Sequence, residues 1–189
     1  MKINELPKKI SIFPLSNFIM FPGTTVPLNI FEPRYLQMVN DSMKINRMIG
    51  MIQPKKSGML KKPDLYEVGC MGKITSFNET EDGRILIILN GVCRFKIISE
   101  IKTDKLYREC NVEYTDFSDD MSQKSNEVNF NDLSLIMENM KKFFKKQGYI
   151  VNLKDLEKKD LNQTLNDLSM ASPFSLEEKQ ILLESLNIN

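Results

Sequence analysis

The sequence predicts an α+β protein, with a strand-rich first part that closes or half closes into a small barrel and a helical second part. Apolar residues recur at alternate positions through much of residues 10–116, which is typical of strands. A polar stretch at residues 118–129 interrupts this pattern, and beyond it the apolar residues recur at helical spacing. We therefore expect a barrel domain at residues 1–117, a linker at 118–130 and a helical bundle at 131–189.

Composition excludes several classes of protein. The chain has 189 residues, 41% hydrophobic and 27% charged, which are the fractions of an ordinary globular protein. Its 26 basic and 25 acidic residues give a net charge of +1, so no overall field favours nucleic acid or an anionic membrane. Residues 1–10 lack the apolar core of a signal peptide, and no apolar run reaches the roughly 20 residues of a membrane span. We expect a cytoplasmic protein that binds no membrane.

Catalytic and metal-binding residues are scarce. The chain contains no histidine, which removes the commonest general base and the usual transition-metal ligand. Its three cysteines, Cys70, Cys93 and Cys110, form no C-x-x-C pair, and we expect them to be reduced core residues. An enzyme that uses Asp, Glu, Lys or Cys is still possible, but the absence of histidine makes enzyme activity less expected, and we predict no cofactor.

The strand-rich part begins with two expected short strands at residues 10–13 and 18–21. Residues 21–35 then combine a Pro22-Gly23 turn, a strand and the start of a helix at Pro33, where a missing N–H costs nothing. The alternating apolar positions of this strand are Val26, Leu28 and Ile30. The residues that follow at helical spacing are Tyr35, Met38, Val39 and Ser42. We expect this helix to fade by Asn46.

A buried strand at residues 48–53 and a polar loop at residues 54–64 are expected next. Met59 and Leu60 are apolar residues at the tip of that loop. The longest predicted strands, residues 66–77 and 84–98, form a hairpin around Asp82-Gly83, a pair that suits a type I′ turn.

Glycines and a last strand complete the predicted sheet. Gly69 and Gly72 indicate a bulge or a close backbone approach, and Gly91 is expected to divide the second arm of the hairpin into two strands. A last strand is expected over residues 106–117.

Three helices are expected in the second part. The first begins at Asn131 or Asp132 and ends at Gly148. Capping boxes then begin a helix at Asp160 with Gln163 and another at Ser175 with Glu178. The apolar residues of the first helix are Leu133, Ile136, Met137, Met140, Phe143 and Phe144. Those of the second are Leu161, Leu165 and Leu168, and those of the third are Ile181, Leu182, Leu183 and Leu186.

Three motifs allow both a functional and a structural interpretation. The stretch Gly50–Ser57 imitates a phosphate-binding loop, but Lys55 replaces the glycine that such a loop needs before its lysine. Glu32 beside Arg34 is more typical of a structural ion pair than of acid–base chemistry. Lysines also cluster in the expected loop (Lys55, Lys56, Lys61 and Lys62) and on the first expected helix (Lys141, Lys142, Lys145 and Lys146). Either group could bind an anion, whereas solvation is the simpler role of the second.

Twelve methionines are numerous for a chain without tryptophan. Most occupy core-like positions, but Met20, Met59 and Met71 do not fit a clear pattern. Flexible thioether side chains suit surfaces that accept varied partners, so a peptide-binding surface is one hypothesis for these methionines.

Several motifs in their order along the chain resemble the N-terminal domain of Lon proteases. They are Phe13-Pro-Leu15, Phe21-Pro-Gly23, Pro27-Leu28, Ile30-Phe-Glu-Pro-Arg-Tyr35, Val68-Gly-Cys70, Asp82-Gly-Arg84, Gly91 and Arg94-Phe95. Pro173-Phe174, Glu178-Lys-Gln180 and Leu182-Leu-Glu184 extend the resemblance to the helical end. The resemblance implies a PUA-like β-barrel with one early helix, a C-terminal helical bundle, and a role in recognising protein substrates. Because the sequence ends at Asn189, we expect neither the ATPase nor the Ser-Lys peptidase activity of full-length Lon.

These observations together predict a non-catalytic module that binds polypeptide, with exposed hydrophobic segments of unfolded proteins as the expected ligand. The predicted site is a groove beside residues 54–63. Its predicted contact residues are Met20, Phe21, Met59 and Leu60. A protease or a chaperone is a further candidate partner, whereas nucleic acid is not expected and the oligomeric state is left open.

Two other functions remain as alternatives. An RNA- or anion-binding PUA-like module would use Lys55, Lys56, Lys61 and Lys62. An enzyme that uses only carboxylates and lysines would require a buried carboxyl group, such as Glu32, with a perturbed pKa.

Overall fold

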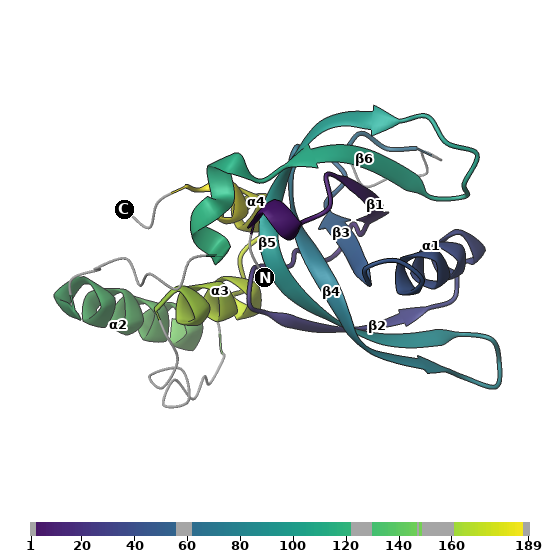
Figure 1. Ribbon diagram of the computed structural model, residues 1–189. Coiled ribbons are helices and arrows are strands. Elements are labelled where there is room, and N and C mark those ends of the chain that lie inside the picture. Colours follow the sequence, from purple (N-terminus) through teal and green to yellow (C-terminus); the bar gives the residue numbers. More distant parts are fainter. Residues whose placement is uncertain (1–2, 56–61, 122–129, 147, 149–160, 187–189) are drawn as a thin grey trace.

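The structure is a computed structural model that describes residues 3–55, 62–121, 130–146, 148 and 161–186 (Figure 1). It confirms a mixed α+β fold with a six-stranded sheet and several helices. The strands are β1 (Lys9–Pro14), β2 (Thr25–Ile30), β3 (Met48–Ile52), β4 (Val68–Glu79), β5 (Ile85–Ile101) and β6 (Arg108–Glu113). The helices are η1 (Ile3–Glu5), α1 (Pro33–Met43), η2 (Thr115–Met121), α2 (Phe130–Lys146), α3 (Leu161–Ala171) and α4 (Leu176–Glu184), of which η1 and η2 are 3-10 helices.

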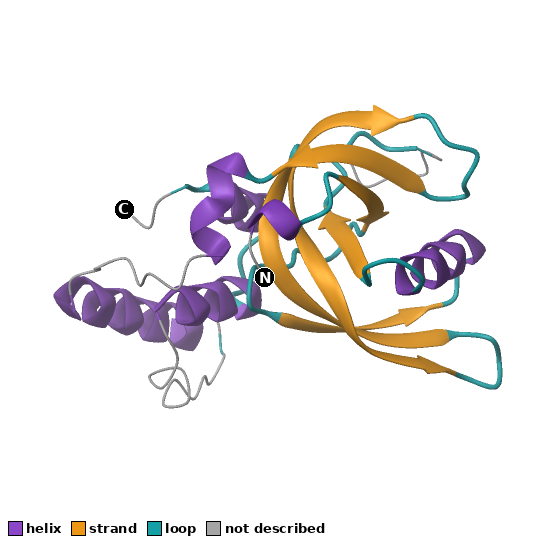
Figure 2. Ribbon diagram, in the orientation of Figure 1, coloured by secondary structure: helices purple, strands orange, loops and turns teal. Residues whose placement is uncertain are grey.

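The sheet has the strand order β2-β5-β4-β3-β1-β6, with an additional pairing between β5 and β6. This pairing joins β5, β4, β3, β1 and β6 into a ring, and β2 lies along β5 outside it (Figure 2). The length of β5 makes this possible, because Ile85–Asn90 pairs with β2 and Lys96–Ile101 pairs with β6. The β1–β3 pair is parallel and the other pairs are antiparallel.

The strands of this ring and the elements packed on them share one hydrophobic core. Fully buried side chains come from several of these strands: Ile12, Ile49, Met71, Leu89 and Phe95. Gly69 lets β4 approach β3 closely, because a Cβ at this position would lie 2.4 Å from the carbonyl oxygen of Met51. The close approach confirms the prediction for Gly69. Beside Gly72 the register shifts because Met71 pairs with Cys93 and Gly72 with Gly91, so the extra residue, Val92, lies in β5 rather than in β4.

The predicted strand-to-helix corner at residues 21–35 is confirmed. Pro33 is the first residue of α1, which follows β2 after a short connection. The four residues predicted at helical spacing, Tyr35, Met38, Val39 and Ser42, are the buried residues of α1. The helix ends at Met43, slightly earlier than expected.

The predicted short strand at residues 18–21 is wrong, because this segment has no regular structure. Its apolar residues Ile19, Met20 and Phe21 are nevertheless buried. The Thr24 hydroxyl group donates to the Phe21 carbonyl oxygen (2.6 Å) and accepts from the Phe21 N–H (3.3 Å). These local bonds satisfy backbone groups that a strand would have paired with a neighbour.

The hairpin between β4 and β5 is confirmed, but its predicted type I′ turn is wrong. A type I′ turn needs positive φ at both central residues, whereas Gly83 alone in this turn has one, at 80°. The Gly83 N–H donates to the Thr80 carbonyl (3.0 Å) and the Thr80 N–H to the Arg84 carbonyl (2.9 Å). This is a three-residue connection with a type I turn followed by a left-handed glycine.

The predicted break at Gly91 is also wrong, because β5 continues from Ile85 to Ile101. Gly91 is required for a different reason. A Cβ at this position would lie 2.2 Å from the carbonyl oxygen of Phe21. The turn after Phe21 therefore packs directly against the backbone of β5.

The predicted linker and first long helix are partly described. Residues 118–121 belong to η2 rather than to a free linker, and residues 122–129 lie outside the described residues. The helix α2 begins at Phe130, so Asn131 and Asp132 lie inside it rather than at its cap. The predicted end is confirmed, because Gly148 has a φ of 81° and its N–H donates to the Lys145 carbonyl (3.1 Å).

Helix α3 docks on the Pro22-Gly23 turn. The Gln163 side-chain amide donates to the Gly23 carbonyl (2.8 Å), and the Asn166 amide donates to the Pro22 carbonyl (3.0 Å). The predicted capping residue Asp160 lies outside the described residues. The Pro22-Gly23 turn is therefore held between α3 on one side and β5 on the other.

Helix α4 has the predicted capping box, since the Ser175 hydroxyl accepts from the Glu178 N–H (3.2 Å) and the Glu178 carboxylate accepts from the Ser175 N–H (2.7 Å). Its predicted apolar face is wrong. Leu183 is buried, but Ile181, Leu182 and Leu186 are exposed. The helix turns Gln180 inward instead, and the Gln180 amide donates to the Val68 carbonyl on β4 (3.0 Å).

The cysteines and the helices bear on two further predictions. Cys70, Cys93 and Cys110 are buried free thiols, as predicted, and burial raises the pKa of Cys93 to about 12 and that of Cys110 to about 11. Within the described ranges, no helix is long and apolar enough to cross a membrane.

Candidate functional site

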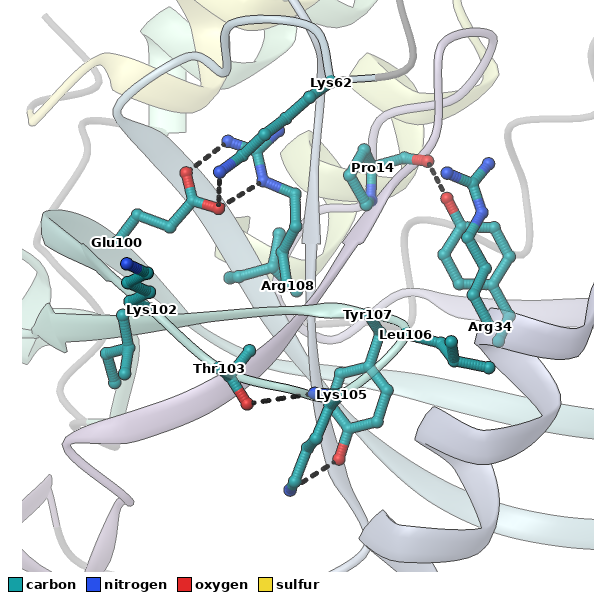
Figure 3. Close-up of a pocket in the computed structure, with 13 residues that line it drawn as sticks. Pro14, Arg34, Lys62, Glu100, Lys102, Thr103, Lys105, Leu106, Tyr107 and Arg108 are labelled. Atoms are coloured by element: carbon teal, nitrogen blue, oxygen red, sulfur yellow. Dashed lines mark hydrogen bonds and ion pairs between the residues drawn. The ribbon is translucent and has the colours of Figure 1, made fainter.

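A pocket of about 280 Å³ lies where β1, the start of α1 and the connection between β5 and β6 meet (Figure 3). It is open to solvent on one side and lies next to the end of the predicted residue 54–64 loop. Its lining comprises Ile12, Pro14, Arg34, Tyr35, Lys62, Glu100, Ile101, Lys102, Thr103, Lys105, Leu106, Tyr107 and Arg108.

One wall is formed by the first turn of α1 packed on β1. The Tyr35 ring contacts the Phe13 ring with centroids 4.3 Å apart, and the Tyr35 hydroxyl donates to the Pro14 carbonyl (3.4 Å). The Arg34 guanidinium lies 4.4 Å above the Tyr35 ring and donates through Nε to Glu32 (2.9 Å). These contacts hold Arg34 at the edge of the pocket, and they show Glu32 as a structural partner.

A second wall is an ion-pair cluster around Glu100. Arg108 donates to both carboxylate oxygens of Glu100, at 3.0 and 2.8 Å, and Lys62 Nζ lies 2.9 Å from the same carboxylate. Burial raises the pKa of Glu100, but the hydrogen bonds from Arg108 and Lys62 outweigh it and lower the pKa overall. Arg108 also donates to the Pro63 carbonyl (2.7 Å), which fastens the end of the loop to β6.

The floor is a polar network that fixes the β5–β6 connection on α1. Lys105 Nζ donates to the Tyr107 hydroxyl (2.8 Å) and to the Glu109 carboxylate (3.1 Å), while the Tyr107 hydroxyl donates to Asp41 on α1 (2.8 Å). Lys9 on β1 pairs with the other oxygen of Glu109 (3.0 Å). The hydrogen bond to Tyr107, then that to Glu109, raises the pKa of Lys105, so it stays charged.

Two side chains at the rim are available to a ligand. Leu106 is 64% exposed although its N–H is held by the Gln37 side-chain oxygen (3.0 Å). Lys102 is exposed and makes no ion pair with any described residue. The pocket thus presents one fixed apolar side chain and one unpaired cation to solvent.

The predicted contact residues are not brought together at this pocket. Met20 and Phe21 are 1% and 3% exposed, so their side chains belong to the core and reach no ligand at the surface. Met59 and Leu60 lie outside the described residues. Lys62, just after them, does line the pocket, whereas the groove predicted beside residues 54–63 stays a prediction.

Sequence reasoning missed the residues that build most of this pocket. Leu106 and Arg108 belong to the predicted strand 106–117, and Glu100 to the segment before it, and none was given a functional role. A usable signal was present, because Lys102, Lys105 and Arg108 recur at intervals of three where that strand begins. Such a run of basic residues indicates a surface rather than a core.

The imitation phosphate-binding loop and an enzyme based on a carboxyl group gain no support from the described residues. Gly50 lies inside the fully buried strand β3, which excludes the imitation phosphate-binding loop. In the described part of the chain, every carboxyl group whose pKa departs from its ordinary value is shifted downward, the opposite of what a general acid requires: Asp82, Glu100, Glu109 and Glu138.

Comparison with known proteins identifies the family. Residues 9–189 match the family model described as the ATP-dependent protease La (LON) substrate-binding domain. The chain is 24% identical to a Lon protease of Flavobacterium johnsoniae over 194 residues and 27% identical to Lon protease 1 of Hydrogenovibrio crunogenus over 202 residues. These matches cover 97% and 100% of this chain but 23% of each relative, so the chain spans about a quarter of their length.

Solved structures show the same fold. The Lon N-terminal domain protein from Xanthomonas campestris matches with a TM-score of 0.66 at 21% identity, covering 95% of this chain and 91% of that one. The N-terminal domain of the Mycobacterium avium complex Lon protease matches with a TM-score of 0.59 at 13% identity over the same shares. The six-stranded sheet, the early helix and the helical end are therefore the Lon N-terminal fold. The family match spans nearly the whole chain, and the chain belongs to the family of Lon substrate-binding domains.

Proposed function

We propose that this chain is a non-catalytic substrate-recognition module that binds polypeptide segments exposed in unfolded proteins, and that it binds them at the pocket beside Leu106. Membership of the Lon substrate-binding family supports the class of ligand. The observation that carries the site is Leu106, a large apolar side chain that is 64% exposed at the rim of a pocket. We also infer that the ring of strands corresponds to the PUA-like barrel that the resemblance implies.

The size of the pocket suits part of a polypeptide better than a free small molecule. Its volume of about 280 Å³ lies just below the roughly 300–1,000 Å³ of typical small-molecule sites. One side chain of a longer segment would enter it, while the neighbouring residues of the segment lie on Leu106. Pro14 and Tyr35 provide apolar surface inside the pocket. An apolar side chain that enters is therefore stabilised by leaving water.

The ion-pair walls keep this surface in place before a ligand arrives. Residues 62–63 are tied to β6 through Arg108, and the β5–β6 connection is tied to α1 through Tyr107. A surface that is already ordered loses less conformational entropy on binding. The walls therefore give the exposed leucine a fixed position.

Partners of the module follow from its relatives. The relatives named as Lon proteases contain this region as about a quarter of their length, so we propose that the module presents bound polypeptide to a proteolytic or chaperone component. An RNA-binding role is not favoured, because Glu100 neutralises Lys62, one of the four loop lysines on which it would depend. Lys56 and Lys61 lie outside the described residues.

The proposal is tested by titrating the protein with fluorescently labelled lactalbumin that has been reduced and alkylated, so that it stays unfolded. We expect Leu106→Asp to weaken binding at least tenfold. Leu86→Asp is the matched control, because Leu86 is an exposed leucine on the outer side of β5 and does not line the pocket. Met59→Asp with Leu60→Asp tests the loop in the same assay. Equal weakening by Leu106→Asp and Leu86→Asp would place the site elsewhere.

A further inference from the structure

We propose that the pocket binds a carboxylate of the polypeptide, so that the module prefers segments in which an acidic side chain or a free C-terminus lies next to an apolar residue. This inference rests on the proposed function, because it assigns the substrate class of the same pocket. It is carried by the charge balance of the lining and by the position of Lys102 within it.

Cations outnumber carboxylates in the pocket. The lining holds one carboxylate, Glu100, and five cations: Arg34, Lys62, Lys102, Lys105 and Arg108. Charged groups bonded to the lining add the cation Lys9 and the carboxylates Glu32, Asp41 and Glu109. Six cations then face four carboxylates. Asp104, exposed on the same connection and outside the lining, still leaves an excess of one positive charge.

One positive charge of this excess belongs to Lys102, and the other is shared by Lys62 and Arg108, which bind the same carboxylate. The Arg108 guanidinium donates to Glu100 and to the Pro63 carbonyl, and Lys62 pairs with the same Glu100 carboxylate. Lys105 is held by Glu109 and Tyr107. Lys102 alone among the five lining cations has no carboxylate partner in the described structure. Figure 3 shows it on the Glu100 side of the pocket with no interaction drawn to it.

The apolar surroundings of Lys102 strengthen its attraction for an anionic group. Ile12, Pro14 and Tyr35 form apolar wall, which excludes part of the water and strengthens the attraction between opposite charges. Leu106 lies in the same lining as Lys102, four residues along the β5–β6 connection. A ligand that satisfies both carries an apolar side chain next to a negative charge.

A carboxylate fits this pocket better than a phosphate group. The excess of one or two positive charges matches a single negative charge, and Glu100 would repel a doubly charged phosphate more strongly than a carboxylate. The guanidinium fork that phosphate recognition commonly uses is already occupied, because Arg108 binds Glu100 with two hydrogen bonds.

Four fluorescein-labelled peptides of twelve residues test the inference by anisotropy. All place one leucine in a glycine-serine background. The first has glutamate beside the leucine and an amidated C-terminus, and the second has glutamine in its place. The third keeps the glutamine but ends after the leucine in a free carboxylate, and the fourth carries phosphoserine.

We expect the glutamate peptide, the free-carboxylate peptide, or both to bind about fivefold more tightly than the amidated glutamine peptide, which converts to about 1 kcal/mol. The better of the two identifies the source of the carboxylate. Lys102→Gln should reduce this ratio to below twofold, and the preference should weaken as salt is raised. Lys73→Gln, which changes an exposed lysine on β4 outside the lining, should leave the ratio unchanged.

The outcomes separate this inference from the function on which it rests. If the amidated glutamine peptide binds as tightly as the others and Leu106→Asp weakens all four, the carboxylate preference is wrong and the proposed function stands. Much tighter binding of the phosphoserine peptide overturns the choice of a carboxylate. If no peptide binds at all, both the inference and the proposed function fail.

Discussion

Arg94 of β5 and Asp120 of η2 form a bidentate ion pair, with Nε 2.9 Å from Oδ2 and Nη2 2.7 Å from Oδ1. The Asp120 side chain is only 8% exposed and also accepts from the Arg94 backbone N–H. The same guanidinium donates to the carbonyls of Leu183 and Ser185 at the end of α4. One side chain thus connects β5, the 3-10 helix η2 and the end of α4.

Loss of this connection should destabilise the whole fold. Arg94→Met leaves the buried Asp120 carboxylate without a cation to balance its charge, so we expect the free energy of unfolding to fall by about 3 kcal/mol in urea denaturation. Adding Asp120→Asn should recover part of the loss, because the uncompensated charge is removed. Arg84→Met is the control, since the Arg84–Asp82 pair is exposed and its removal should have no measurable effect. Equal effects of the two arginine variants would refute this role.

Glu109 should make stability depend on acid pH. Its side chain is 6% exposed, and although burial raises its pKa, hydrogen bonds from Lys9 and Lys105 lower it overall below the ordinary 4.5. A lowered folded-state pKa stabilises the protein above about pH 4.5, and this stabilisation is lost as the pH falls through the folded-state value.

Glu109→Gln removes that linkage. At pH 7 we expect the variant to be less stable by about 1 kcal/mol, a modest value because Lys9 is half exposed. The difference from the unaltered protein should shrink as urea unfolding is repeated below pH 4.5. A difference that stays constant from pH 7 to pH 3 would show that the Glu109 charge contributes nothing.

Gly91 should tolerate no side chain. The methyl group of Gly91→Ala would lie only 2.2 Å from the Phe21 carbonyl oxygen. Neither atom can move away without a shift of the backbone. We expect a loss of about 2 kcal/mol or more in thermal unfolding. Gly83→Ala is the comparison, because a Cβ there meets nothing within 4 Å and suffers only from its φ of 80°, at about 1 kcal/mol. A smaller loss at Gly91 than at Gly83 would contradict the close approach.

Local parts of the fold could be predicted from the sequence. The inward face of α1 follows from helical spacing, and the Ser175–Glu178 capping box follows from two residues three positions apart. The approach of strands at Gly69 follows from the absence of a side chain. Each of these depends on neighbours within a few residues, which is the range that periodicity and turn chemistry describe.

Parts that depend on distant segments could not be predicted. Gln180 faces inward on α4 because its side chain binds the Val68 carbonyl of β4, and nothing within the helix itself reveals that partner. The apolar residues of that helix were therefore assigned to the wrong face. The segment at residues 18–21 has the apolar content of a strand, but the Thr24 side chain satisfies its backbone instead.

The candidate site shows the same limit. Its walls come from residues 12, 14, 34–35, 62, 100–103 and 105–108, which only the closed arrangement of strands brings together. Of the segment beside which a groove was predicted, residues 54–63, Lys62 lines this pocket, and the predicted groove itself stays a prediction. The sequence could not identify Leu106, since an isolated exposed leucine has no pattern to distinguish it from a core residue.

Photo-cross-linking most directly tests the claim that polypeptide binds beside Leu106. A photoreactive phenylalanine analogue replaces Leu106 in one variant and Leu86 in a matched one, and each is irradiated with reduced, alkylated lactalbumin before mass spectrometry. We predict cross-links to lactalbumin from position 106, reduced by an excess of unlabelled unfolded protein, and few from position 86. Cross-links that are equally abundant from both positions, or absent from position 106, would contradict the account.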